Sequence, residues 1–154
     1  MRKGLWLVMT LGLALLLLGL LQTGLANAQA GDTPNHADVV VDLGDGRVIA
    51  RRITFSEADI SGLQALKLTG LDLSIADFDF GAAVCSVEQV GCPVDNCFCD
   101  SDLFWGYQHL EEGSWQAYQV GAADSAVAGG AVEGWLWGPF DAALPQVTQE
   151  YLAA

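Results

Sequence analysis

The sequence predicts an α+β domain that is mainly β: a small antiparallel-rich sheet, one short helix packed on it, and a disulfide-pinned loop. Runs of Val, Ile and aromatic residues recur between glycine turns, which is typical of short strands. A single capped helical segment interrupts these runs. Four cysteines lie close together in the middle of the chain. A length of 154 residues favours one domain.

The first 30 residues predict a signal peptide for export. Arg2 and Lys3 precede an almost unbroken apolar run over residues 4–21. Small residues ending at Ala28 and at Ala30 then form two sites of the A-x-A type that signal peptidase cleaves. We expect a secreted or extracytoplasmic, cell-surface protein. The alternative is an uncleaved N-terminal anchor, because the apolar run is long enough to span a bilayer.

The charge distribution argues against nucleic acid as a partner. The chain has 19 Asp and Glu residues against 6 Lys and Arg, a formal net charge of −13. Arg2 and Lys3 belong to the predicted signal, so only four basic residues remain after it. Nucleic-acid affinity depends on Lys and Arg that displace phosphate counterions, and anionic membranes repel a polyanion. We therefore expect no nucleic acid, and no membrane after signal cleavage.

A hairpin and a helix are the first predicted elements. Residues 37–43 and 48–55 are rich in Val and Ile and flank a glycine turn, which is the pattern of two antiparallel strands. Arg51 breaks the alternation of the second strand, which leaves either a bulge or an edge strand with an outward Arg. Ser61 and Gln64 form a capping box for a short helix. This helix runs to about Thr69 and stops at Gly70.

Strands dominate the rest of the domain. They are predicted over residues 73–75, 82–90, 104–110, 115–120 and 132–137, with a loop or twisted edge over 77–81. The domain as a whole is predicted over 37–138. A flexible lead-in over 31–36 precedes it, and an apolar-acidic C-terminal tail over 139–154 follows it.

The four cysteines predict two disulfides, since an even, clustered set in an exported chain favours oxidation. Cys97 and Cys99 are too close to pair comfortably. Two pairings stay open: Cys85–Cys97 with Cys92–Cys99, or Cys85–Cys99 with Cys92–Cys97. The spacing lacks the C-x2-C pairs of structural zinc, so we predict no metal here.

Several short motifs, in this order along the chain, resemble a known family. They are Thr69-Gly70-Leu71, Phe104-Trp105-x-Tyr107, Trp115, Gly121-Ala122 and Val132-Glu133-Gly134-Trp135-x-Trp137. The chain over 37–138 thereby resembles the transcobalamin-like C-terminal domain family, exported bacterial domains related to the smaller β-rich domain of cobalamin carriers. The resemblance implies a sheet with a packed helix, secretion and capture of a cobalamin-like ligand. The large helical domain of the carriers has no counterpart over 37–138, and the cysteine loop departs from the family pattern.

The predicted ligand-binding surface is aromatic. Alternation places Trp105, Tyr107 and His109 on one side of their strand, and it places Trp135 and Trp137 on one side of the last strand. The predicted ligand-binding residues are Trp105, Tyr107, His109, Trp115, Tyr118, Trp135 and Trp137. Aromatic walls suit a flat or amphipathic ligand such as a corrinoid or a sugar. The alternative for each ring is packing in the core.

No enzyme, metal site or cofactor is predicted, and a corrinoid enters only as a candidate ligand. His109 as a ligand of a metal or of corrinoid cobalt is the alternative to an ordinary half-buried strand histidine. Asp95, Asp100 and Asp102 crowd the cysteine loop, but their spacing departs from the calcium-binding loop and favours solvated acids. The sequence has no nucleophile elbow, phosphate-binding loop or zinc-protease motif.

These features predict an exported, non-enzymatic binding domain that captures a small, amphipathic, corrinoid-like ligand for uptake. Its partners would be that ligand or a cell-surface or transport protein. One alternative is a cell-surface protein-interaction or assembly module, and another is a carbohydrate-binding module. A concave aromatic pocket would favour the small ligand, whereas a flat exposed patch would favour a protein partner.

Overall fold

The computed structural model describes residues 33–146 of the chain. The predicted signal peptide over 1–30 and the last residues of the predicted tail lie outside the described residues. Within residues 33–146, no helix combines the length and the apolar character needed to cross a bilayer.

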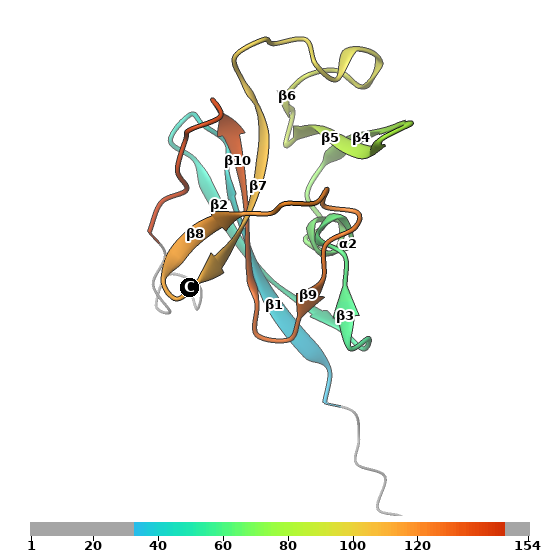
Figure 1. The fold of residues 1–154 in the computed structure, drawn as a ribbon, viewed down its shortest axis with the longest axis vertical. Helices are drawn as coiled ribbons and strands as arrows, with labels where there is room; N and C mark the ends of the chain where they lie inside the picture. Colours follow the sequence, from blue (N-terminus) through green and yellow to red (C-terminus); the bar gives the residue numbers. More distant parts are fainter. Residues whose placement is uncertain (1–32, 147–154) are drawn as a thin grey trace, which may run out of the picture. The chain divides into compact units, whose positions relative to one another are not determined.

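A five-stranded mixed sheet forms the centre of the domain (Figure 1). Its strands follow the order β2-β1-β10-β7-β8, and all neighbours are antiparallel except β1 and β10, which run parallel. The strands are β1 (Asn35–Asp42), β2 (Val48–Phe55), β7 (Phe104–Glu111), β8 (Ser114–Ala117) and β10 (Val132–Gly138). β1 therefore begins inside the segment that the sequence predicts as a lead-in.

In the described part of the chain, one short α-helix and two small sheets complete the fold. In Figure 1 they lie to one side of the five-stranded sheet. The elements are α2 (Gly62–Leu68), the pair β3 (Asp59–Ile60) and β9 (Val127–Ala128), the sheet β4 (Leu73–Phe78), β5 (Gly81–Val87) and β6 (Val90–Gly91), and the 3-10 helix η1 (Val94–Asn96). The predicted class, mainly β with one short helix, is confirmed.

The start of α2 follows from its capping residue. The Ser61 hydroxyl accepts a hydrogen bond from the backbone N–H of Gln64 at 3.1 Å, as the capping box predicts. Thr69 caps the other end, and Gly70 then adopts φ +71°, a conformation that glycine takes without strain. Leu63 and Leu66 are buried, so the helix packs through an apolar face.

Arg51 lies on an exposed edge strand, which decides between the two interpretations of its position. β2 is the outermost strand of the sheet, and its register with β1 runs without a bulge from Phe55 to Val48. Arg51 is exposed, and its neighbour Arg52 pairs with Asp38 across the strands at 2.9 Å. Charged side chains on such an edge discourage pairing with a further strand.

Several local predictions need correction. The strand predicted over 73–75 continues to Phe78. Of the two alternatives for residues 77–81, the loop is therefore wrong: they belong to the tip of the β4–β5 hairpin at the edge of the small sheet, where Phe78 pairs with Gly81. The strand predicted over 82–90 turns at Glu88 and Gln89, which have φ of +50° and +65°. Neither residue is a usual turn former, so the sequence carries no turn signal there. The strand predicted over 115–120 ends at Ala117, so Tyr118 lies beyond it. In addition, the short strands β3 and β9 were not predicted, because two residues show no alternation.

The central sheet buries apolar residues on both faces. Val39 and Val41 of β1 point toward the helix and the small sheets, where they join Leu66, Val87 and other buried residues. Val40 points the other way and packs with Leu136 and Leu144. Strand alternation therefore separates two cores, and the C-terminal segment covers the second.

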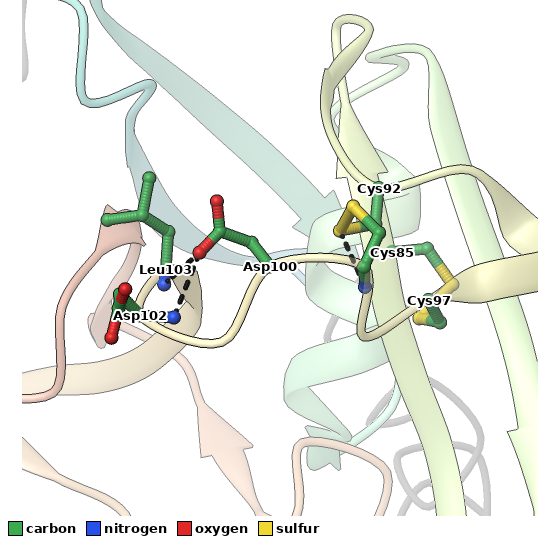
Figure 2. The surroundings of a disulfide bond; sticks show 7 residues. Cys85, Cys92, Cys97, Asp100, Asp102 and Leu103 are labelled. Atoms are coloured by element: carbon green, nitrogen blue, oxygen red, sulfur yellow. Dashed lines mark hydrogen bonds between the residues drawn. A yellow bond between two sulfur atoms is a disulfide. The ribbon is translucent and has the colours of Figure 1, made fainter.

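The disulfides are Cys85–Cys97 and Cys92–Cys99, the first of the two predicted pairings (Figure 2). Cys85 is buried in β5, so the first disulfide attaches the loop to the small sheet. Beyond the cysteines, the Asp100 carboxylate accepts hydrogen bonds from the backbone N–H groups of Asp102 and Leu103 at 2.9 and 3.0 Å. The loop is therefore held by two crosslinks and by its own side chains.

Candidate ligand-binding cavity

Strands β7 and β10 bring four of the predicted aromatic residues together. Their register places Trp105 opposite Trp137 and Tyr107 opposite Trp135. The ring centroids of the first pair lie 5.8 Å apart and those of the second 4.6 Å apart. Residues directly opposite on neighbouring strands point to the same face, so these rings form one continuous wall.

Tyr118 extends this wall from the segment that follows β8. Its ring lies 4.5 Å from that of Tyr107 and is nearly parallel to it, with an angle of 10° between the planes. The His109 ring lies 4.4 Å from that of Tyr118. The Tyr118 N–H also donates to the Tyr107 carbonyl at 3.4 Å, which holds the two residues side by side.

A cavity of about 670 Å³ opens in front of this wall. Five of the seven predicted ligand-binding residues line it: Trp105, Tyr107, Tyr118, Trp135 and Trp137. Trp135 is only 3% exposed and belongs to the main core, so for this ring the alternative of core packing also holds. β5, the cysteine loop and the connection from β8 to β9 supply the other sides, including Val84, Phe98, Asp100, Ser101, Val120 and Ala122. The aromatic face is thus concave.

The remaining two predicted residues lie elsewhere. Trp115 lies on the opposite face of the sheet, where it packs against the core of Val40 and Leu144 and donates from Nε1 to the Pro145 carbonyl at 2.9 Å. His109 stands on the aromatic face but does not line the cavity. Its Nε2 atom is 3.7 Å from the Glu111 carboxylate.

A buried carboxylate, Glu133, holds the two tyrosines of the wall. It is fully buried, and both tyrosine hydroxyls donate to it, Tyr118 at 3.1 Å and Tyr107 at a shorter distance. Ser125 continues the network, because its hydroxyl lies 3.1 Å from the Tyr107 hydroxyl and accepts from the Gly62 N–H at 3.0 Å. The network therefore ties the cavity wall to the start of α2.

Glu133 is not among the predicted site residues, although the sequence carries a signal for it. Glu133, Trp135 and Trp137 alternate along one strand, so they point to the same face. A carboxylate on the same face of a buried strand as two predicted wall residues is unusual, and it needs hydrogen-bond partners. The tyrosines that satisfy it come from β7 and from beyond β8, and only the fold brings them to it.

Burial changes the acidity of this network. It raises the pKa of Tyr118 to about 12 and shifts the pKa of Tyr107 upward more strongly, helped by the hydrogen bond to Glu133. Burial likewise raises the pKa of Glu133 above its usual 4.5, although the tyrosine hydrogen bonds oppose the shift. Both phenols are therefore neutral donors at neutral pH.

Glu133→Gln is expected to change how stability depends on pH. Because the folded-state pKa of Glu133 is raised, the folded protein binds its proton more tightly than the unfolded chain does. Its contribution to stability is complete below pH 4.5 and is lost as pH rises through the folded-state pKa. The unfolding free energy of the Gln variant minus that of the wild type should grow in this window, by at most about 1.4 kcal/mol per pH unit.

Urea unfolding of both proteins between pH 4 and pH 8 measures this difference. If the unfolding free energies of the Gln variant and the wild type differ by the same amount at every pH, the substitution acts through packing alone. A difference that stays flat or shrinks as pH rises would contradict the raised pKa.

The described residues contain no group of three or more His, Cys, Asp or Glu side chains that could hold a metal ion. In the cysteine loop, the Asp100 carboxylate is engaged by backbone N–H groups of its own loop. The four cysteines are all in disulfides.

Comparison with known proteins gives a structural match only. No protein-family model and no curated protein matches the sequence. Among solved structures, haptocorrin in complex with Cbi matches with a TM-score of 0.50 over 71% of this chain. The C-terminal β domain of haptocorrin is transcobalamin-like. The domain has a transcobalamin-like fold.

This match confirms the predicted resemblance at the level of the fold. The sequence identity is 10%, and the aligned part makes up 26% of the haptocorrin chain. The transcobalamin-like domain thus spans about a quarter of that protein. The two disulfides of the present chain indicate an oxidising, extracellular environment.

Proposed function

We propose that the transcobalamin-like domain is an exported binding domain that captures a small, flat, amphipathic molecule in the aromatic cavity without altering it chemically. The observation that carries this proposal is the meeting of five aromatic rings on one concave wall. The likeness to a non-enzymatic carrier protein supports it.

The size and rigidity of the cavity suit such a ligand. Cavities of roughly 300–1,000 Å³ with mainly apolar linings are typical of small-molecule sites. The Glu133 carboxylate fixes both tyrosine hydroxyls, so the rings of Tyr107 and Tyr118 are held in place before a ligand arrives. A wall that is already ordered loses less entropy on binding.

The charge of the cavity favours a neutral or cationic ligand. Among the described residues that line it, Asp100 is the single charged one. Every Lys and Arg of the sequence lies at or before Lys67, and none of them lines the cavity. An anionic molecule would find a carboxylate and no compensating cation.

A corrinoid is the first ligand to test, since the haptocorrin structure contains Cbi. The domain spans about a quarter of that chain and offers one aromatic wall, so we expect weak binding by the domain alone. Weak binding would let the cavity release the ligand, which could then pass to a transport protein. The ring planes of Trp105 and Trp137 lie at 46° to each other, which departs from the coplanar platform expected for a sugar-binding site.

Trp105→Leu is expected to weaken corrinoid binding about tenfold, because an aromatic contact of roughly 1.4 kcal/mol is lost. Trp115→Leu is the matched control, since it removes the same side chain from the opposite face of the sheet. The measurement is quenching of tryptophan fluorescence during titration with Cbi, alongside a thermal-shift assay. Equal loss of binding in both variants would point to destabilisation rather than to a site.

A panel of neutral, cationic and anionic flat ligands accompanies this titration. Absence of both quenching and thermal shift with every member would overturn the proposed function. Preference for the anionic members would contradict the charge argument.

A further inference from the structure

Three phenylalanines form a cluster on the surface. Phe78 is the last residue of β4 and Phe80 lies in the turn that leads to β5, and their rings stack 5.0 Å apart with 3° between the planes. Phe98 comes from the cysteine loop, and its ring lies 5.3 Å from Phe78 and 6.3 Å from Phe80. We call these residues the phenylalanine cluster.

The cluster is exposed and largely separate from the cavity. Phe80 is 73% exposed and Phe98 is 59% exposed, and none of the three rings belongs to either buried core. Phe98 borders the cavity, but Phe78 and Phe80 do not line it. Large apolar side chains gathered on a surface indicate a site of interaction.

Both disulfides hold this cluster in place. Phe98 lies between Cys97, which is bonded to Cys85 of β5, and Cys99, which is bonded to Cys92. The backbone is therefore crosslinked on each side of an exposed aromatic ring. Such ordering lowers the entropy that binding would otherwise cost. It explains why an irregular loop carries two crosslinks beside a solvent-exposed Phe.

The surroundings of the cluster are acidic. Asp77 and Asp79 alternate with its phenylalanines in the hairpin, and Asp95 belongs to η1, which lies beside β4. All three carboxylates are exposed. No Lys or Arg follows Lys67 anywhere in the sequence. An apolar cluster on a chain with a formal net charge of −13 complements a basic surface, whereas a second copy of this chain or an anionic bilayer would be repelled.

From these observations we propose that the phenylalanine cluster is a docking surface for a protein partner that presents apolar side chains among Lys and Arg. The proposal does not depend on the function of the cavity. The rings would supply the contact energy, and the carboxylates would select the partner by charge.

The test uses protein produced from the full sequence and a labelled amphipathic peptide of Lys and Leu, with a Glu and Leu peptide as the opposite charge. Fluorescence anisotropy should show binding of the basic peptide that weakens with salt. Phe80→Ser should weaken it about tenfold, as expected for an aromatic at the centre of an interface. Leu68→Ser is the matched control, since Leu68 is an exposed apolar residue at the end of α2.

Phe80→Ser leaves every charge in place, so it separates docking from general attraction between opposite charges. Unchanged affinity in both Phe80→Ser and Phe98→Ser would overturn the proposal. Tighter binding of the acidic peptide would also overturn it. So would Phe80-dependent self-association in sedimentation, or Phe80-dependent binding to neutral lipid vesicles. Circular dichroism and intact disulfides in both variants establish that they are folded.

Discussion

Gly62→Ala is expected to lower the free energy of unfolding by about 3 kcal/mol. Gly62 opens α2, and a methyl group there would overlap the Tyr107 hydroxyl and come within 2.9 Å of the Ser125 hydroxyl. Overpacking costs about 1–3 kcal/mol, and a broken buried hydrogen bond adds roughly 1–3 kcal/mol. The added methyl group does both, because the crowded atoms are the ones that connect Glu133 to the helix.

Urea unfolding measures this loss, and Gly106→Ala is the control. Gly106 lies on β7 between two wall residues, and a methyl group there meets only the Leu136 carbonyl, at an ordinary 3.7 Å. We expect Gly106→Ala to stay close to wild type. Because Tyr107 is part of the cavity wall, Gly62→Ala should also weaken ligand quenching. A Gly62→Ala protein as stable as wild type would show that the network is not tightly packed.

Removal of the Cys85–Cys97 disulfide is expected to cost about 3 kcal/mol of stability. The crosslink spans 12 residues, and closing a loop of that size restricts the unfolded chain by about this amount. The double variant Cys85→Ala, Cys97→Ala removes this disulfide. Alanine is chosen over serine, because serine would bury a hydroxyl at the fully buried position 85. Since this disulfide attaches the loop to β5, hydrogen exchange should speed up between residues 93 and 103.

The matched control is Cys92→Ala, Cys99→Ala. That disulfide spans 7 residues, so its loss should cost less, about 2.5 kcal/mol. Peptide mapping of the unreduced wild type checks the pairing itself. A Cys85–Cys99 peptide would contradict the structure, and a larger loss in the control would contradict the loop-length argument.

Local patterns predicted the elements well where one stretch of chain determines the outcome. The Ser61 cap, the glycine hairpin after β1 and the alternating aromatics of β7 depend on neighbours a few residues away, and each is found as predicted. The turn at Glu88 and Gln89 was missed, because those residues accept a positive φ only under the constraint of the pairings around them.

The candidate site was predictable in part for the same reason. Alternation indicated that Trp105 and Tyr107 share a face, and that Trp135 and Trp137 share another. Pairing of β7 with β10 in this register then joined the two sets into one wall. Trp115 lies on the opposite face, and Glu133 entered the site only through tyrosines distant in the sequence.

The sequence by itself determined the class of the domain, its helix cap, its main strands, the acidic charge and the oxidation of its cysteines. The tertiary structure alone decided that β1 and β10 run parallel, which cysteines pair, and that aromatic rings from three segments form one wall of a cavity. It also placed Phe98 against the β4–β5 hairpin. The physical reason is range. Backbone periodicity and capping act within a few residues, whereas strand neighbours, register and burial depend on contacts between segments far apart in the chain.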